Sequence, residues 1–367
     1  MVAVSDSIRL AAVDCVTPFG DAAATHAALL GGHSALHAIP VLGRDGGDPV
    51  PLALLPGRAL DEAHPPAWIE AVRALLAPVV ADGWGTPRRP VCFASSNFGV
   101  GSLYAFRREG DPAYLPYGAP HLCVDSLCRA FGWGANIAIF SHACVTAHVA
   151  LLHGTRLVQA GAADEVLVVA FDFLSPFVAG GFHALKILNR HFPAPYQDRP
   201  IGAIALGDGA AYAVLSRDRG EFALPGQALF NEMHHFTANR ADGSGFAAVL
   251  AALPVAGRRC WLKGHGTGTL DAGRLECTTL AHAFPGAPLV GWKGALGHTL
   301  GSCGLIELAL AAVALRTGRT PATVGSAGPT FADNVALAPF DNRACDAALC
   351  TSNAFGGAHA ALLLAHA

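Results

Sequence analysis

A chain of 367 residues, 52% of them hydrophobic and 14% charged, can bury an extensive core and exceeds the usual length of a single compact domain. Its formal net charge of −3 excludes the broad basic field that nucleic acid or an anionic membrane requires of a partner. The first residues lack a signal-peptide pattern, and the longest apolar run, 308–315, is too short to span a bilayer, so we expect a cytoplasmic protein.

The ten cysteines lie mostly within apolar segments and lack the dense spacing of a disulfide framework, which predicts reduced thiols. Cys123 and Cys128, with His121 beside them, are potential zinc ligands, but no second Cys or His pair completes a set of four. We therefore expect no bound metal. Lysine is rare and occurs only at positions 186, 263 and 293.

Along the chain, short apolar segments alternate with helical patterns. Nine of these segments, bounded by Gly, Pro or Asp, predict strands buried on both faces, at residues 8–16, 89–96, 135–142, 164–172, 210–217, 260–266, 288–294, 347–353 and 360–367. Two longer stretches rich in Ala and Leu, 145–160 and 300–317, predict helices. This alternation predicts a layered α/β fold with a largely buried sheet.

A polar, turn-rich segment at 217–227 predicts a linker between two intimately packed halves, 1–217 and 218–367. Each half offers a strand, a turn and a long helix: 136–140 precedes the first helix, and 289–292 precedes the second. This correspondence is compatible with an internal duplication.

Cys144 lies where the strand at 136–140 turns into the following helix. The first turn of a helix has unpaired N–H groups and the positive end of the helix dipole, both of which stabilise a thiolate. We therefore expect a lowered thiol pKa and a nucleophilic cysteine. A lone cysteine in apolar surroundings would more often be an inert core residue.

Two histidines downstream strengthen the interpretation of Cys144 as a nucleophile. His265, in KGHGTGT, follows a predicted strand, and His298, in KGALGH, precedes a predicted helix, with Lys293 five residues before it. Taken singly, each histidine would be an ordinary core or loop residue. Their order after Cys144, with AFGGAH near the C-terminus, indicates one catalytic set.

Together these motifs resemble those of the β-ketoacyl synthase family of the thiolase superfamily. The resemblance covers nearly the whole chain, through VDCVTPFG, HACVTAH, VAGGFHALKIL, IALGDGAAYAVL, HGTGT, KGALGH and AFGGAH. It implies a thiolase-like, layered αβαβα fold built from two similar halves. It also implies a dimer, either with itself or with a second ketosynthase-like subunit.

The resemblance implies a decarboxylative Claisen condensation. Cys144 would hold an acyl group, while His265 and His298 would bind the carbonyl of a malonyl thioester and promote loss of carbon dioxide. The substrates would be carried on the phosphopantetheine of an acyl carrier protein, with no cofactor bound by the enzyme. Lys293 would tune the neighbouring groups, and Glu307, a carboxylate within an apolar helix, would be its partner.

The resemblance also implies roles around the reacting groups. The backbone N–H groups of Cys144 and Phe355 would form an oxyanion hole. Other positions match residues that bind pantetheine, gate the acyl pocket from two loops, or contact the carrier protein. They are Thr267 and Thr269 for pantetheine; Gly180, Gly181, Phe182 and Phe355 for gating; and Lys186 for the carrier.

The chain departs from the family pattern at several positions. Gly273 stands where an aspartate is usual, which predicts altered local structure, and Ala358 and His359 replace Thr and Asn. The segment 96–143 is shorter than in elongating synthases. These differences favour a specialised polyketide or polyene-type member.

Two alternatives stay open. One is a ketosynthase-fold acyltransferase that does not decarboxylate, and the other is a chain-length or scaffold subunit of a heterodimer. Retention of both histidines counts against the first, and Cys144 counts against the second. A biosynthetic thiolase is disfavoured because the second cysteine of its C-terminal motif is missing near Phe355.

Overall fold

The strands are the framework of the computed structural model, which describes residues 1–4, 7–41, 49–61, 68–235 and 238–367. Eleven strands form one sheet in the order β12-β11-β15-β16-β10-β2-β9-β7-β5-β6, with β1 paired to β10. Their bounds are β1 (Val2–Val4), β2 (Ile8–Val16), β5 (Val91–Ala94), β6 (Ile137–Phe140), β7 (Glu165–Asp172), β9 (Gly209–Ser216), β10 (Phe222–Asn231), β11 (Cys260–Lys263), β12 (Leu289–Val290), β15 (Ala347–Ala354) and β16 (Ala358–His366).

Two smaller sheets and the helices complete the described fold. The small sheets contain β3 (His37–Pro40), β4 (Pro49–Ala53) and β8 (Leu206–Gly207), and β13 (Arg319–Thr320) with β14 (Phe340–Asp341). The α-helices are α1 (Ala22–Leu30), α2 (Trp68–Leu76), α3 (Val100–Glu109), α4 (Pro120–Phe131), α5 (Thr146–Gln159), α6 (Pro176–Ala184), α7 (Ser244–Ala251), α8 (Leu270–Ala283), α9 (Lys293–Leu296) and α10 (Cys303–Thr317). Short 3₁₀ helices are η1 (Val80–Asp82), η2 (Pro112–Tyr117) and η3 (Leu300–Ser302).

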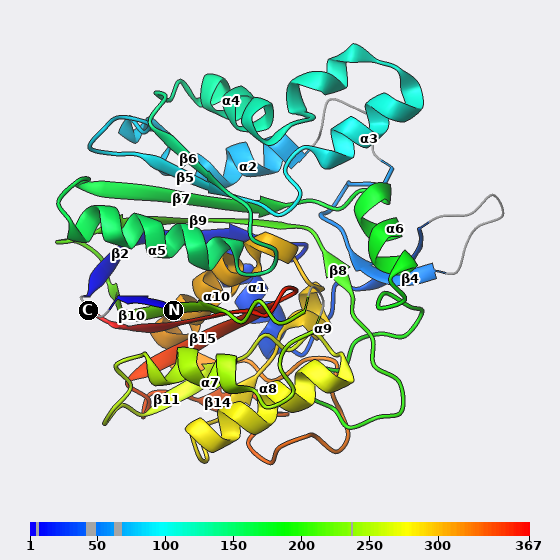
Figure 1. The fold of residues 1–367 in the computed structure, drawn as a ribbon, viewed down its shortest axis with the longest axis vertical. Coiled ribbons are helices and arrows are strands. Elements are labelled where there is room, and N and C mark those ends of the chain that lie inside the picture. The colour runs from blue at the N-terminus through cyan, green and yellow to red at the C-terminus, as the bar shows by residue number, and fades with distance from the viewer. Residues whose placement is uncertain (5–6, 42–48, 62–67, 236–237) are drawn as a thin grey trace.

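The elements stack in five layers, which run from top to bottom in Figure 1. Helices α2, α3 and α4 cover strands β5, β6, β7 and β9; below these lie helices α5, α10 and α1, then strands β10, β11 and β15, then helices α7 and α8. Because β2 pairs with both β9 and β10, it joins the two strand layers into one sheet. The predicted layered αβαβα fold is confirmed.

The predicted linker at 217–227 is wrong in its second half. All nine predicted strands are present, but β10 also begins at Phe222, inside that segment. Phe222 and Leu224 are buried and pair with Leu10 and Ile8 of β2. The strand depends on partners far away in sequence, and an irregularity between Ala223 and Gly226 interrupts its pattern. The division at 217 and 218 stays a prediction.

Helix α10 is the core helix of the middle layer. Every residue from Cys303 to Leu315 is buried, and the helix contacts α1, α5, β2, β9 and β15. Within the described residues, 300–317 is long and apolar enough to cross a membrane by length and composition, but 83% of it is buried inside the molecule. An all-round apolar surface is typical of such a core helix.

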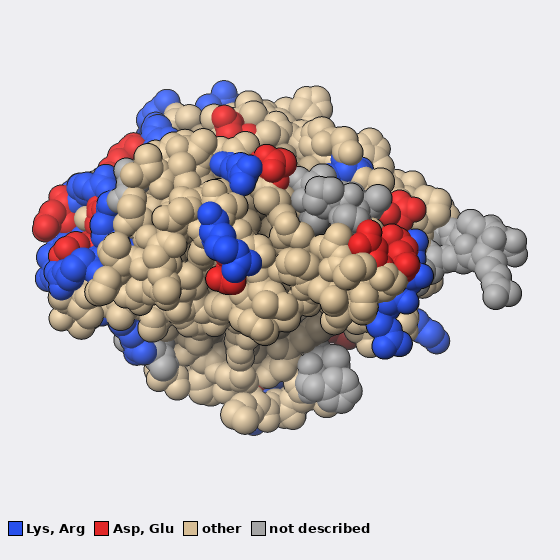
Figure 2. All heavy atoms as spheres, turned by 90° about the horizontal axis from the view of Figure 1, so that it is seen from above, with Lys and Arg blue, Asp and Glu red and all other residues tan. Residues whose placement is uncertain are grey.

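Residues 96–143, which the resemblance predicts to be shortened, form α3, η2, α4 and β6, and the helices lie on the outer face. Cys123 and Cys128 are buried in their apolar core, whereas His121 is exposed, so these residues do not assemble a metal site. All ten cysteines, each within the described residues, are unpaired. Seen over this side of the molecule, basic and acidic side chains are interspersed on a mostly uncharged surface (Figure 2).

Gly207→Ala should strongly destabilise the protein, because a Cβ there would lie 2.0 Å from the backbone oxygen of Leu296. Overpacking of this kind typically costs about 1–3 kcal/mol. We expect urea denaturation to show a loss in the free energy of unfolding near the upper end of this range. Gly181→Ala is the matched control: a Cβ there meets open space within α6, so higher helix propensity should add about 0.5–1 kcal/mol. Equal effects of the two changes would contradict this packing.

Candidate active site

Cys144 lies in a sharp turn between β6 and α5. Ala143, just before it, has a left-handed backbone with φ of 46°. The Thr146 hydroxyl stabilises the turn by accepting a hydrogen bond from the His142 N–H at 2.7 Å and donating one to the Ala143 carbonyl at 2.6 Å. The turn therefore presents the Cys144 thiol at the end of the strand.

The two histidines come from the other half of the chain and meet Cys144 at one point. The His298 ring nitrogen Nε2 lies 2.9 Å from Cys144 Sγ. The rings of His265 and His298 are nearly perpendicular, with centroids 5.0 Å apart. The His298 N–H donates to the Ala205 carbonyl at 2.7 Å, which fixes its backbone. The structure thus brings together the three residues that the motifs singled out.

The predicted lowering of the Cys144 pKa is wrong. Burial raises the pKa of this thiol, and the opposing effects of the Lys293 charge and of a hydrogen bond from the Phe355 N–H do not offset it. Burial also holds the pKa of His265 and His298 well below that of ordinary histidine, and the Lys293 charge adds to the effect. At rest the site therefore contains a protonated thiol facing two neutral imidazoles.

A buried cluster of two lysines and one glutamate lies behind these groups. Lys293 Nζ donates to Glu307 Oε1 at 2.6 Å, as predicted, and Lys263 Nζ contacts Glu307 Oε2. The lysine side chains are 2% and 0% exposed. Burial alone would lower the pKa of Lys293, but Glu307 raises it; burial and the Lys293 charge lower the pKa of Lys263. The single carboxylate of Glu307 therefore pairs with two amines.

The excess positive charge of this cluster opposes the binding of a metal ion nearby. The donor atoms of Cys144, His265 and His298 all lie within 4.8 Å of one another, and sulfur and nitrogen are donors that zinc accepts. A cation there would be repelled by the charge on Lys293. The charge on Lys293 therefore disfavours a metal ion at these three donor atoms.

Cys144 and both histidines open into one pocket of about 570 Å³. Among the predicted residues, Thr267, Thr269, Phe182 and Phe355 also line it. The rings of Phe182 and Phe355 stack with centroids 6.4 Å apart, and the two threonine hydroxyls lie 3.0 Å apart. Sequence reasoning missed the remaining lining residues, which are Ile187, Ile204, Asn239, Ala272, Asn353 and Ala354.

The predicted gating loop at residues 180–182 is wrong in its local structure. Gly180, Gly181 and Phe182 belong to helix α6, which begins at Pro176 and is capped by the side chain of Ser175. Phe182 reaches the pocket, whereas Gly180 and Gly181 are absent from its described lining. Phe355 does lie in a turn, between β15 and β16, and is 39% exposed.

Two other predicted positions lie outside the pocket. Lys186 is exposed just after α6, with a left-handed backbone at φ of 60°. Gly273, expected to alter local structure, lies in the regular helix α8, where a Cβ would meet the Phe331 ring at 3.4 Å. Gly273 therefore belongs to an uninterrupted helix.

Glu276 is a supporting residue that the sequence analysis missed. It accepts hydrogen bonds from the backbone N–H groups of His265 and Gly266 and from the Tyr196 hydroxyl. The sequence signal for Glu276 was its position as the single carboxylate on the buried face of the helix that follows HGTGT. Lys263 had a signal too, since only three lysines occur in the chain.

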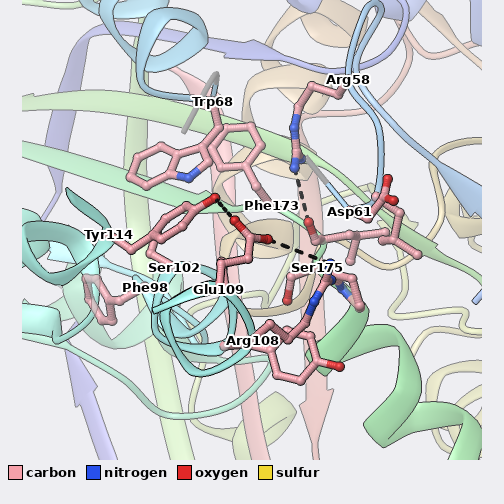
Figure 3. A pocket seen from close by; sticks show the side chains of 16 residues that line it. Arg58, Asp61, Trp68, Phe98, Ser102, Arg108, Glu109, Tyr114, Phe173 and Ser175 are labelled. Carbon is pink, nitrogen blue, oxygen red and sulfur yellow. Dashed lines mark hydrogen bonds and ion pairs between the residues drawn. The ribbon is translucent and has the colours of Figure 1, made fainter. Parts of the chain in front are cut away.

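A second pocket shares no lining residue with the first (Figure 3). Three of its polar side chains pair within the protein: Arg58 pairs with Asp208 at 2.7 Å, and the Tyr114 hydroxyl donates to Glu109 at 2.7 Å. Trp68 stacks on Phe173 with centroids 5.4 Å apart. These contacts account for the pocket as part of the packing beneath α3.

Acid should destabilise the protein through His148, His265 and His298. Burial lowers the pKa of all three, that of His148 to about 3, whereas an unfolded histidine titrates near 6.5. Below that pH the unfolded chain binds protons that the folded protein does not, which lowers stability by about 1.4 kcal/mol per pH unit for each ring. Asp172, whose pKa burial raises to about 7, opposes this as one group.

We therefore expect the free energy of unfolding, from urea denaturation between pH 6.5 and 4.5, to fall as the pH falls, although Asp208, whose pKa burial also raises, reduces the slope. His148→Gln should reduce that slope by the contribution of one ring. A stability that stays constant over this range would contradict the proposed neutral state of the buried histidines.

A five-layered fold in which a cysteine at a strand–helix turn faces two histidines defines the thiolase-like class. Residues 224–327 match the family described as beta-ketoacyl synthase, C-terminal domain. The 3-oxoacyl-[acyl-carrier-protein] synthase 2 of Rhizobium meliloti (strain 1021) is 30% identical over 306 residues, which cover 72% of each chain. The chain belongs to the β-ketoacyl synthase family, as its motifs predicted.

Other relatives differ in how much they share. The tetracenomycin polyketide synthase ketoacyl synthase alpha subunit of Streptomyces glaucescens is 30% identical over 274 residues, which are 65% of this chain and 63% of that relative. A chain from the complex of a ketosynthase with its chain length factor from Xenorhabdus doucetiae superimposes with a TM-score of 0.83. It is 22% identical, and the match covers 99% of this chain and 98% of that chain.

Proposed function

We propose that this protein catalyses the decarboxylative condensation of a Cys144-bound acyl group with a malonyl thioester. The observation that carries the proposal is the 2.9 Å contact of Cys144 Sγ with His298 Nε2, beside the perpendicular His265 ring. The names of the relatives, a 3-oxoacyl-[acyl-carrier-protein] synthase and a polyketide ketoacyl synthase, support it. The product is a β-ketoacyl thioester.

In the first half-reaction the Cys144 sulfur attacks the carbonyl of an acyl thioester. The thiol proton passes to His298 as the carbon–sulfur bond forms, which suits a thiol that is protonated at rest beside a neutral base. The N–H groups of Cys144 and Phe355 donate to the tetrahedral oxyanion. The bond to the carrier sulfur then breaks, and the proton on His298 leaves with the carrier thiol.

In the second half-reaction His265 and His298 donate hydrogen bonds to the carbonyl oxygen of the malonyl thioester. The bond to its carboxylate carbon breaks, carbon dioxide leaves, and the electron pair forms an enolate that these hydrogen bonds and the nearby Lys293 charge stabilise. The enolate carbon attacks the acyl carbonyl on Cys144. The carbon–sulfur bond breaks, and the Cys144 thiolate takes up a proton from water, which replaces the proton lost with the carrier thiol. These steps use no cofactor.

The pocket fits a substrate on a long polar arm. Thr267 and Thr269 supply hydroxyls for the amides of phosphopantetheine, and Phe182 and Phe355 flank the way to the apolar part of the pocket. We infer that an acyl carrier protein delivers both substrates and that exposed Lys186 contributes to its docking, because carrier proteins are acidic. A cytoplasmic location agrees with this supply.

A second subunit is supported by the edge of the sheet. Strand β6 ends the sheet next to the Cys144 turn, and Ile139 on it is 40% exposed. An open, apolar strand edge favours pairing with another chain. The partner is a second copy or a related ketosynthase-like subunit, as in the Xenorhabdus complex. The name of the Streptomyces glaucescens relative supports a role in polyketide synthesis.

Incubation with acyl- and malonyl-carrier protein tests the proposal. Carbon dioxide release, the β-keto product and the mass of the Cys144 peptide are followed together, and we expect all three signals. An acyl adduct without carbon dioxide would instead indicate an acyltransferase. Carbon dioxide without β-keto product would indicate a need for a partner subunit, and absence of any adduct would overturn the assignment.

A further inference from the structure

A buried histidine–carboxylate pair lies beside the catalytic set. His359 Nε2 lies 3.0 Å from Glu232 Oε1, and the two side chains are 1% and 0% exposed. Two glycines leave room for the carboxylate: a Cβ at Gly245 would lie 2.3 Å from Glu232 Oε1, and a Cβ at Gly357 would lie 3.0 Å from Glu232 Cβ. The surroundings therefore accommodate this glutamate closely.

The sheet register gives the His359 ring a second partner. On β16, His359 lies opposite Asn353 of β15, and its Nδ1 is 2.7 Å from Asn353 Oδ1. Asn353 Nδ2 donates to Glu276 Oε1 at 3.3 Å, so turning the amide over would set its oxygen against a carboxylate. Both ring nitrogens of His359 thus face oxygen acceptors, and the ring with two N–H groups fits both.

Charges around His359 act in opposite directions. Burial lowers the pKa of its ring, whereas the hydrogen bond and charge of Glu232, followed by the charge of Glu276, raise it. The aromatic ring of Phe246 on α7 packs against it with centroids 5.6 Å apart. The net effect lowers the pKa of the ring, so the second ring proton is present only in acid, and the distances to Asn353 and Glu232 define the pairing.

This hydrogen-bond network connects to the wall of the active-site pocket. Asn353 lines the pocket together with Cys144. Glu276, to which the Asn353 amide donates, holds the backbone N–H groups of His265 and Gly266. A chain of hydrogen bonds therefore runs from His359 to the loop of one catalytic histidine.

We propose that His359 is a positioning residue: paired with Glu232, it fixes the Asn353 amide in the pocket wall and, through Glu276, the backbone at His265. The proposal rests on the proposed function, because it assigns the effect to decarboxylation, the step in which His265 acts. Acylation of Cys144 uses His298, which lies on a different segment. A displacement of His265 alone should therefore slow decarboxylation without slowing acylation.

His359→Gln tests this separation, since glutamine cannot donate to both acceptors with the geometry of the ring. We expect carbon dioxide release from malonyl-carrier protein to fall roughly tenfold or more, with Cys144 acylation within about twofold of the parent. Adding Asn353→Ala to His359→Gln should cause little further loss.

His26→Gln is the matched control, because His26 is a buried histidine whose Nε2 lies 2.9 Å from the Arg319 carbonyl, outside this network. It should leave the ratio of the two rates unchanged. Equal loss of both half-reactions in His359→Gln, or loss of neither, would overturn the positioning role.

A measurement independent of turnover separates this proposal from the proposed function. Nitrogen-15 NMR of the parent should show a protected N–H proton at His359 Nδ1, which faces Asn353 Oδ1, and Asn353→Ala should shift the Nδ1 signal. A ring without a protected proton at Nδ1 would overturn the clamp. If that proton is present but the parent performs neither half-reaction, the proposed function fails and the clamp stands.

Discussion

Cys144→Ala is expected to abolish condensation, with a loss of at least about 10⁴-fold, because no other group can hold the acyl chain. The acyl adduct should disappear from the peptide mass spectrum. Carbon dioxide release from malonyl-carrier protein should persist, since His265 and His298 remain in place. The two half-reactions would thereby be assigned to different side chains of one site.

Cys303→Ala is the control for this change. Cys303 is also a buried thiol, and its sulfur lies 3.5 Å from the Cys144 carbonyl oxygen. We expect this variant to be acylated and to condense nearly as the parent does. Acylation of Cys144→Ala at the parent's rate would overturn the nucleophile assignment.

Glu307→Gln is expected to produce the largest loss of stability among single changes at the site. It removes the carboxylate that Lys263 and Lys293 share and leaves buried positive charge without a counter-charge. Loss of one partner from a buried ion pair typically costs about 3–5 kcal/mol, and urea denaturation at pH 7 measures it. Activity should fall as well, because the cluster borders both histidines.

Lys263→Met in the Glu307→Gln background should recover part of the lost stability, because it removes one of the two buried amines. Asp125→Asn is the surface control: its pair with Arg129 is exposed, and such pairs contribute about 0–1 kcal/mol. A Glu307→Gln protein as stable as the parent would show that the lysines are not charged in the fold.

The sequence predicted what depends on local pattern. Continuous apolar runs identified strands such as β7 and the core helix α10. The strand-to-helix turn identified Cys144, and glycine-flanked motifs identified His265 and His298. Strand β10 escaped prediction because its burial arises from pairing with β2 and β16, which lie far away in the chain. Its polar flank and its irregularity around Gly226 resemble a linker.

Charge states at the site also lay beyond the sequence. A helix start predicts a lowered thiol pKa, but burial of Cys144 acts in the opposite direction and is larger. Burial is a property of the whole fold, so no local motif reports it. The pairing of Glu232 with His359 is similar, because only the register of three strands brings these residues together.

The central position of α10 has a consequence for how the two walls of the active site can change. His298 leads into this helix, whose amide hydrogens should exchange with solvent only when the whole protein unfolds. Heating should therefore remove catalytic competence and native structure in a single transition. The opposite wall includes Phe355 in a half-exposed turn, where substitutions cost less stability. Divergence in substrate range is thus expected at that turn, while the histidine wall stays constant.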